Sequence, residues 1–287
     1  MNVRPRRSVL YVPGSSSRAL EKARGLPVDG LILDLEDAVA PAAKEEARRA
    51  VGAALATGGF GHREVALRVN GPATPWGADD LAFAARAGAA AVVLPKVEFP
   101  GEVRDAEEAL AAAGAPPELA LWCMIETPRG VLAAAEIAAA TPRLAALVLG
   151  TSDLVKELGA RHTPGRAEVL VALGTVLLAA RAHGLVALDG VHLDLADDAG
   201  FEAACRQGRD LGFDGKTLIH PKTIEVANRA FSPSEAELAH ARRIIAAHAE
   251  AEAAGRGVVV VDGRLVEALH VEAARRLVAL AEAIAAR

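Results

Sequence analysis

Short apolar runs recur along the chain, and segments with the apolar spacing of amphipathic helices lie between them. The runs predict eight β-strands, at residues 8–12, 31–35, 65–69, 91–94, 119–125, 144–149, 185–188 and 216–219. The segments between them are rich in Ala, Glu and Arg and predict helices at residues 42–55, 79–87, 101–113, 130–140, 167–183 and 195–211. Strands that alternate with helices indicate a parallel sheet, and eight such units are typical of a TIM (β/α)8 barrel.

An open, doubly wound sheet is the alternative α/β architecture. It usually has fewer strands, and no GxGxxG motif follows the first predicted strand. We therefore predict a TIM (β/α)8 barrel with a C-terminal helical extension.

The alternation stops after Pro221. A long helix is predicted from about residue 233, with Ser232 or Ser234 as its N-cap. A Gly-rich break at residues 255–257 leads to a short strand at 258–261 and a last helix at 266–286. We expect a catalytic barrel domain at residues 1–230 and an extension at residues 231–287 that forms a lid at subunit contacts.

Composition and charge narrow the class of protein. Hydrophobic residues make up 52% of the 287 residues and the net charge is −5, so a folded globular chain is expected rather than a disordered one. Apolar runs are too short for a membrane span, and without a basic tract nucleic acid is not an expected partner. Cys123 and Cys205 lie far apart and predict neither a disulfide framework nor a zinc site. With no signal-length apolar run at the N-terminus, we expect a cytoplasmic enzyme.

Polar residues close most of the predicted strands, which matters because TIM barrels place their active sites at the carboxyl ends of the strands. In chain order these residues are Asp34, Glu36, Asp37, Arg68, Asn70, Lys96, Glu98, Glu126, Asp153, Asp189 and His220. Period-2 alternation separates Asp34 and Glu36 from their leucine neighbours, and likewise separates Arg68 and Asn70 from Leu67 and Val69. The apolar face is expected to pack on helices and the polar face to point into the barrel mouth.

Carboxylates without a His or Cys cluster favour Mg²⁺, or Mn²⁺, over Zn²⁺. Glu126 and Asp153 end two neighbouring predicted strands and form the simplest ligand pair, because Mg²⁺ typically takes only one or two protein carboxylates. Asp153 can instead cap the helix that follows it. Arg68 can likewise be a structural partner that neutralises Glu36 or Glu126.

Seven segments, in order along nearly the whole chain, resemble the citrate lyase beta subunit and malyl-CoA lyase group of the HpcH/HpaI aldolase family. They are RSVLYVPG (7–14), LILDLEDAVAPAAK (31–44), LRVN (67–70), LPKVE (94–98), MIETPRG (124–130), LGTSDL (149–154) and FDGKTLIHP (213–221). The resemblance implies a TIM-barrel lyase that cleaves or forms the carbon–carbon bond between a 2-oxo acid and an acyl-CoA. It also implies a homo-oligomer, a trimer or a multiple of one.

Residue roles follow from the same resemblance. Glu126 and Asp153 correspond to the Mg²⁺ ligands, with Glu126 also next to the substrate, and Arg68 corresponds to the substrate-contacting arginine. Glu36 and Asp37 correspond to acids that support the metal site. The N-terminal region that receives CoA in the family contains Tyr11, Arg18 and Lys22, although Arg18 and Lys22 also suit solvated helix positions.

The C-terminal extension departs from the family pattern. Relatives have a lid motif of the type GxMID whose Asp reaches the neighbouring subunit's site, whereas the matching stretch here is GRLVE (263–267). Glu267 keeps the carboxylate but adds one methylene, and it also suits the first turn of a helix. Glu36, Asp37 and Glu267 are all candidates for the acid or base.

Other functions are compatible with the sequence. Lys96 or Lys216 could form a Schiff base, although the acids near Lys96 would keep its amine protonated. The chain could also be the beta subunit of a larger citrate lyase complex that acts on carrier-bound thioesters, or a thioesterase for malyl-CoA-type substrates.

Overall fold

The computed structural model describes residues 4–255 and 257–287 and divides the chain into two compact units. One unit is Arg6–Phe231, and the other contains Ser232–Arg287 together with the N-terminal residues through Pro5. Each unit is described separately. Among the described helices, none has both the length and the apolar character that crossing a membrane requires.

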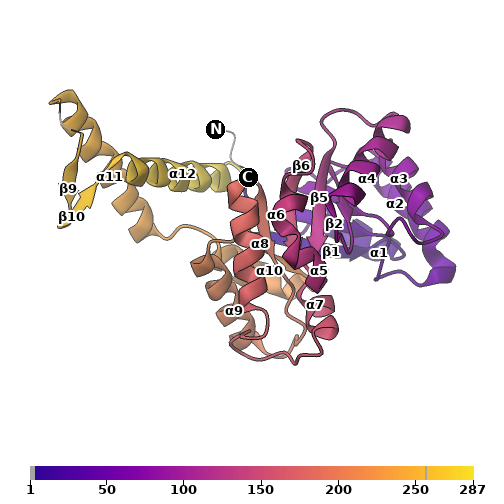
Figure 1. Cartoon of the computed structure of the whole chain (residues 1–287). Coiled ribbons are helices and arrows are strands. Elements are labelled where there is room, and N and C mark those ends of the chain that lie inside the picture. Colours follow the sequence, from indigo (N-terminus) through magenta and orange to yellow (C-terminus); the bar gives the residue numbers. More distant parts are fainter. Residues whose placement is uncertain (1–3, 256) are drawn as a thin grey trace. The chain divides into compact units, whose positions relative to one another are not determined.

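The unit Arg6–Phe231 is a closed barrel in which all eight strands are parallel (Figure 1). The strands pair in chain order, and the last pairs with the first. The predicted TIM barrel is therefore confirmed, and no predicted strand end differs from the observed one by more than one residue. The strands are β1 (Ser8–Pro13), β2 (Gly30–Asp34), β3 (Glu64–Arg68), β4 (Ala91–Leu94), β5 (Ala120–Ile125), β6 (Leu144–Leu149), β7 (Val186–Asp189) and β8 (Gly215–Leu218).

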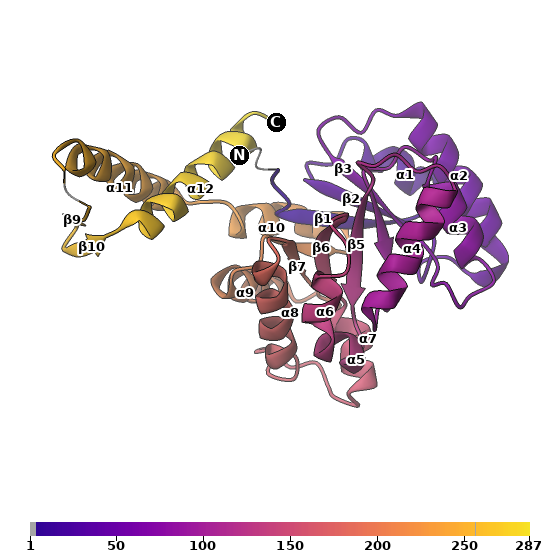
Figure 2. The same cartoon turned by 45° about the horizontal axis from the view of Figure 1, so that its top comes forward.

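Helices surround the barrel, as two views of it show (Figures 1 and 2). Those matching predicted segments are α2 (Lys44–Thr57), α3 (Gly77–Ala84), α4 (Pro100–Ala112), α5 (Pro128–Leu132) with α6 (Ala134–Ala138), α8 (Leu170–Ala182) and α9 (Asp198–Leu211). The sequence pattern did not bound the three short helices α1 (Ser17–Ala23), α7 (Thr151–Glu157) and α10 (Ile224–Ala230), because two turns are too few to display a 3.6-residue period. Two 3₁₀ turns, η1 (Pro41–Ala43) and η2 (Pro221–Thr223), precede α2 and α10.

The strands carry two separate apolar layers. Leu31, Leu33 and Leu35 belong to the layer between strands and helices, whereas Ile32 belongs to the barrel interior. The same alternation places Trp122 and Met124 inside and their neighbours outside. The predicted facing of these strands is confirmed, because successive side chains of a strand point to opposite faces. The interior layer comprises Val9, Ile32, Ala66, Ala91, Val93, Trp122, Met124, Ala146, Val148 and Leu188.

Ion pairs involving residues just before β1 lie at the amino-terminal end of the barrel. Arg6 donates from Nη2 to Oε1 of Glu64 over 2.8 Å, and its guanidinium lies 5.8 Å from the Trp122 ring centre. Arg7 donates from Nε to Oδ2 of Asp29 over 2.7 Å. These basic residues neutralise acids at the end of the barrel opposite the predicted active site.

The second unit contains α11 (Glu235–Ala253), a hairpin of β9 (Val259–Val261) and β10 (Arg264–Val266), and α12 (Ala268–Ala285). Ser234 caps α11, and Glu237 completes a capping box, which selects Ser234 from the two predicted caps. The first hairpin strand was predicted from its continuous valine run, whereas the second, with the sequence RLV, has no such apolar run and was not. Within the predicted Gly-rich break, Arg256 lies outside the described residues.

Candidate active site

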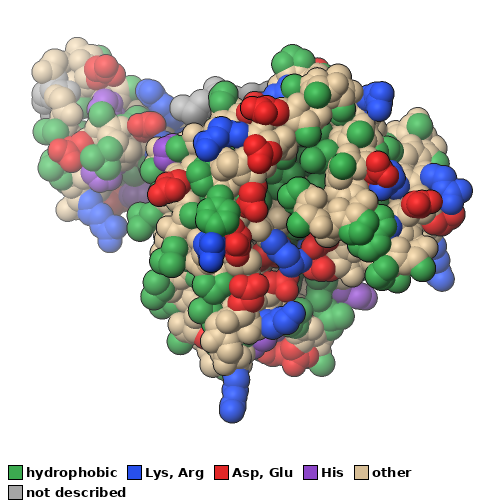
Figure 3. Space-filling view, turned by 45° about the vertical axis from the view of Figure 1, so that its right-hand side comes forward, with side chains coloured by type: hydrophobic (Ala, Val, Ile, Leu, Met, Phe, Trp, Pro, Cys, Tyr) green, Lys and Arg blue, Asp and Glu red, His purple; other side chains and the backbone are tan. Residues whose placement is uncertain are grey.

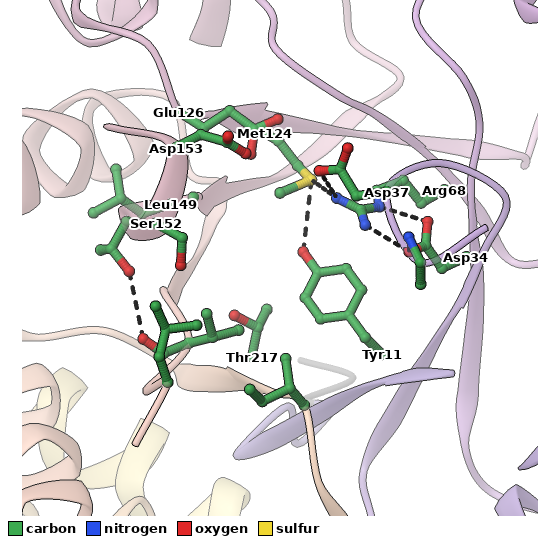
Figure 4. Close-up of a pocket in the computed structure, with 16 residues that line it drawn as sticks. Tyr11, Asp34, Asp37, Arg68, Met124, Glu126, Leu149, Ser152, Asp153 and Thr217 are labelled. Carbon is green, nitrogen blue, oxygen red and sulfur yellow. Dashed lines mark hydrogen bonds and ion pairs between the residues drawn. The ribbon is translucent and has the colours of Figure 1, made fainter. Parts of the chain in front are cut away.

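A cavity of about 330 Å³ lies at the carboxyl ends of the barrel strands (Figure 4). Its walls contain residues of β1, β2, β3, β5, β6 and β8, of the segments that follow β2, β5, β6, β7 and β8, and of the first turn of α7. Tyr11, Asp37, Arg68, Glu126 and Asp153 are among them. Five predicted site residues from distant parts of the chain therefore meet at one place.

Arg68 forms a two-pronged ion pair with Asp34 inside the barrel mouth. Its Nε and Nη2 donate to the two Asp34 carboxylate oxygens over 2.7 Å and 2.6 Å. Asp34 is fully buried and also accepts the backbone N–H groups of Glu36 and Ala38, over 2.9 Å and 3.1 Å. The aspartate therefore fixes both the guanidinium and the start of the loop that carries the other acids.

Tyr11 and Met124 support the same guanidinium from the interior side. The Arg68 guanidinium carbon lies 4.9 Å from the centre of the Tyr11 ring, and Arg68 Nη1 lies 3.7 Å from the Met124 sulfur. Tyr11 donates its hydroxyl to that sulfur over 3.6 Å. Burial raises the pKa of Tyr11, so the phenol stays neutral. Although burial by itself lowers the pKa of Arg68, the Asp34 partner raises it, so the guanidinium stays charged.

Glu36 and Asp37 form an acidic side of the mouth, and Lys96 pairs with both of them. Arg68 Nη1 lies 2.9 Å from Glu36 Oε2 and 3.7 Å from Asp37 Oδ2. The Lys96 ammonium lies 2.5 Å from Glu36 Oε1 and 3.4 Å from Asp37 Oδ2. Burial raises the pKa of Glu36 even though Arg68 and Lys96 oppose that shift. Asp37 is the more accessible of the two acids, with 57% of its side chain exposed.

Glu126 and Asp153 lie beside one another on the other wall of the cavity (Figure 4). Glu126 is buried, and its Oε1 accepts the backbone N–H of Lys96 over 2.8 Å. Burial raises the pKa of Glu126 to about 7, although Lys96 and Arg68 oppose the shift. Asp153 lies in the first turn of α7, with 29% of its side chain exposed.

Gly150 leaves the space that Glu126 needs. A Cβ atom at residue 150 would lie 2.3 Å from Glu126 Oε2 and 2.4 Å from its Cβ, so any larger residue would displace the carboxylate. A buried carboxylate of raised pKa, with a glycine making room for it, is suited to a cation that replaces its proton.

The two carboxylates fit Mg²⁺, and they do not fit a metal whose ligands must all come from the protein. Across residues 4–255 and 257–287, no group of three or more His, Cys, Asp or Glu side chains is arranged to hold a metal ion. Two carboxylate ligands with a cavity beside them suit Mg²⁺, which keeps water or substrate oxygens in its remaining positions. A structural zinc site, by contrast, requires four protein ligands.

Several predicted residues lie outside the cavity. Arg18 and Lys22 are exposed on α1 and do not line it, so Tyr11 is separated from the two cations with which the family resemblance groups it. Glu267 belongs to the other unit, immediately before α12, where its backbone N–H donates to His270 Nδ1 over 3.0 Å.

Two strand-end residues expected at the mouth have structural partners instead. The Asn70 side-chain amide donates to Asp80 Oδ2 over 2.6 Å, which ties β3 to α3. Asp189 is buried between Arg166 and Lys216, and its Oδ2 would lie 2.7 Å from a Cβ added to Gly208 of α9. Asp189 therefore faces the surrounding helices, and the expectation that these two side chains point into the mouth is wrong.

The lysines of the Schiff-base alternative have ion-pair partners. Lys216 is fully buried and donates to Asp189 Oδ2 over 2.8 Å, away from the cavity. Although burial lowers the pKa of Lys96, its hydrogen bond to Glu36 more than compensates and raises it, so its amine stays protonated. Neither geometry favours a nucleophilic amine.

Sequence reasoning did not assign site roles to Asp34 or Gly150, and for Lys96 it offered only a Schiff base, not the ion pairs with Glu36 and Asp37. Asp34 and Lys96 each end a strand as a polar residue, which was a signal, but the pattern alone could not tell which acid holds Arg68. For Gly150, the signal was a glycine placed between the end of a predicted strand and the TSD segment. Ser152 and Thr217 also line the cavity, as do the partly exposed Leu193 and Ile219.

On the face drawn in Figure 3, acidic and basic side chains are interspersed with apolar ones.

A closed parallel barrel with buried carboxylates, an arginine and a cavity at its carboxyl-terminal mouth defines a TIM-barrel enzyme. The chain belongs to the HpcH/HpaI aldolase/citrate lyase family, whose model matches residues 7–221. This confirms the resemblance found in the sequence motifs.

Relatives match almost the whole chain. It is 54% identical over 282 residues to a (3S)-malyl-CoA thioesterase of Cereibacter sphaeroides (strain KD131), covering 98% of this chain and 96% of that protein. It is 37% identical over 284 residues to citrate lyase subunit beta of Escherichia coli K12, covering 97% and 94%. A crystal structure of CitE from Mycobacterium tuberculosis, in complex with magnesium, acetoacetate and coenzyme A, matches with a TM-score of 0.77 and 33% identity, covering 97% and 98%.

Proposed function

We propose that this protein is a Mg²⁺-dependent carbon–carbon lyase that interconverts a malyl-type CoA thioester with a 2-oxo acid and an acyl-CoA such as acetyl-CoA. The observation that carries the proposal is the cavity itself, in which Arg68 faces the Glu126 and Asp153 carboxylates. The magnesium and coenzyme A in the M. tuberculosis complex support the same assignment.

Glu126 and Asp153 would hold the cation, and the bound Mg²⁺ would polarise the hydroxyl and carboxylate oxygens of the substrate. Arg68 is the group available to stabilise the negative charge of the thioester enolate when the carbon–carbon bond breaks. Asp34 and Tyr11 hold the guanidinium in a single orientation, which preorganises it for that charge.

Proton transfer requires a base for the substrate hydroxyl and an acid for the enolate carbon. Glu36 lies beside Arg68 and is nearly buried, whereas Asp37 is exposed at the rim and can exchange protons with solvent. We therefore propose that Asp37 is the group at the mouth that passes protons, and that Glu36 keeps Arg68 in position.

Thioester hydrolysis is a second candidate, and one specific observation favours it. The 54% identity to a (3S)-malyl-CoA thioesterase extends over nearly the full length of both chains. Both reactions use a malyl-type thioester, but lysis breaks a carbon–carbon bond and leaves the thioester intact. Hydrolysis adds water to the thioester carbonyl and releases the thiol.

Product analysis separates the two reactions. Purified protein with Mg²⁺ is supplied with malyl-CoA, and glyoxylate and free thiol are measured in parallel. We expect glyoxylate and acetyl-CoA to form in amounts equal to the substrate consumed, with no free thiol. Malate and free CoA alone would replace the lyase assignment with the thioesterase one. Turnover only with a carrier-protein thioester would instead assign a subunit of a larger lyase complex.

We further propose that the unit of residues 232–287 serves a neighbouring subunit in a homo-oligomer, by family resemblance a trimer or a multiple of it, and supplies Glu267 to that subunit's site. Glu267→Gln is then expected to lower kcat by about 100-fold or more, because the amide keeps the shape of the side chain but cannot transfer a proton as a carboxyl group can. Light scattering of the wild type should give a multimer.

Glu272→Gln is the matched control, because Glu272 is an exposed acid of the same unit, in the first turns of α12, and among the described residues its ion pair is with Arg276. A monomer at micromolar concentration with full activity, or equal kcat in both variants, would contradict this role of the extension.

A further inference from the structure

The Lys96 ammonium occupies a place among several carboxylates of the mouth. It lies 2.5 Å from Glu36 Oε1, 3.4 Å from Asp37 Oδ2 and 4.0 Å from Asp153 Oδ2. Glu126, the other proposed cation ligand, accepts the backbone N–H of the same residue. One lysine therefore contacts both walls of the cavity, the one that holds Arg68 and the one proposed to bind the cation.

The backbone of Lys96 is specialised for this position. Its φ is 51°, in the left-handed region that non-glycine residues seldom adopt. Lys96 lies two residues after the end of β4, and this conformation lets its N–H donate to Glu126 Oε1 while the side chain extends toward Glu36. The next residue is held in turn by a hydrogen bond from the Val97 N–H to the Met124 carbonyl over 3.2 Å. The two contacts of Lys96 are thus separable, since one uses the main chain and the other the side chain.

The ammonium and a divalent cation compete for the same negative charge. Like charges at such distances repel, and the carboxylates cannot give their full attraction to both. Lys96 can withdraw without repacking of the core, because 42% of its side chain is exposed and its four-carbon stem is flexible. Arg68 is less able to withdraw, since it is buried and held by two hydrogen bonds to Asp34.

We propose that Lys96 is a positioning residue that substitutes for the cation: in the metal-free protein its ammonium balances the carboxylates of the mouth, and it is displaced when Mg²⁺ binds, which sets the Mg²⁺ affinity. The proposal rests on the proposed function, in which Glu126 and Asp153 hold the cation. It implies that the wild-type protein binds Mg²⁺ less tightly than its carboxylates alone would allow.

Calorimetric titration of Mg²⁺ into substrate-free protein, at about pH 8 where exposed carboxylates are ionised, tests the proposal. Lys96→Met removes the ammonium but keeps the backbone N–H that positions Glu126. We expect its Mg²⁺ dissociation constant to fall about tenfold relative to the wild type. We also expect a lower Tm in EDTA and a larger rise in Tm on adding Mg²⁺. Lys96→Asn, uncharged and suited to a positive φ, should behave in the same way if the methionine variant folds poorly.

Arg129→Met is the matched control, because it makes the same change in net charge near the mouth. Arg129 is mostly exposed, and its ion-pair partner among the described residues is Glu98, at 3.7 Å, rather than any of the carboxylates that Lys96 contacts. The Mg²⁺ affinity of Arg129→Met should equal that of the wild type. An unchanged or weaker Mg²⁺ affinity in both folded Lys96 variants would overturn the proposal while leaving the metal site standing. Absence of Mg²⁺ binding in the wild type would instead overturn the proposed metal dependence, and this inference with it.

Discussion

Glu126→Gln and Asp153→Asn are each expected to lower kcat about 1,000-fold, because a metal ion that polarises a substrate oxygen contributes several kcal/mol to the transition state. Glutamine keeps the shape of Glu126 and can still accept the Lys96 N–H, so the fold should remain intact. Burial of an ionised carboxylate is unfavourable, so the neutral Glu126→Gln variant should have at least the wild-type Tm in EDTA. The rise in Tm that Mg²⁺ produces in the wild type should disappear.

A third variant tests the same site without removing a carboxylate. In Gly150→Ala, the added methyl group would displace the Glu126 carboxylate, so Mg²⁺ affinity and kcat should both fall. Gly174→Ala is its control, since a Cβ there meets nothing within 4 Å and the residue lies inside α8. That control should gain about 0.5–1 kcal/mol of stability and keep full activity.

Full turnover of Glu126→Gln, or of the wild type in EDTA, would remove the metal from the mechanism.

Arg68→Lys is expected to lower kcat about 100-fold, because loss of one preorganised donor to a developing oxyanion typically costs about 3 kcal/mol. Lysine keeps the charge but cannot reproduce the two parallel hydrogen bonds to Asp34 that fix the guanidinium. Because Asp34 is fully buried, the variant should also lose about 1–3 kcal/mol of unfolding free energy. Steady-state kinetics per folded molecule and chemical denaturation measure the two effects separately.

Arg166→Lys is the matched control for this substitution. Arg166 also pairs with a fully buried aspartate, with Nη1 lying 2.8 Å from each Asp189 carboxylate oxygen, but neither residue lines the cavity. Arg166→Lys should lose about as much unfolding free energy as Arg68→Lys and keep its kcat. A fall of less than threefold in the kcat of Arg68→Lys, with stability lost as in the control, would assign Arg68 a structural role only.

The barrel was predictable because its determinants are local. Leu31, Leu33 and Leu35 alternate with Ile32 and Asp34, and this two-residue period specifies a strand with one face toward helices and one toward the interior. Parallel strands need helical crossovers, so the same alternation placed the strand-end residues at one mouth. Arg68, Glu126 and Asp153 were found there without any knowledge of their contacts.

Long-range contacts determined which polar groups meet one another at the mouth. Asp34 and Glu36 share a face in the sequence pattern, yet Asp34 holds the fork of Arg68 and Glu36 meets Lys96, because strand register and loop direction set which oxygens come within reach. Asn70 shares the alternation of Arg68 but turns to Asp80, since the chain leaves the strand after Arg68. A period of two specifies side-chain direction only while the strand continues. Beyond its end, as at Lys96 with its positive φ, the hydrogen bonds of neighbouring strands determine where each polar group lies.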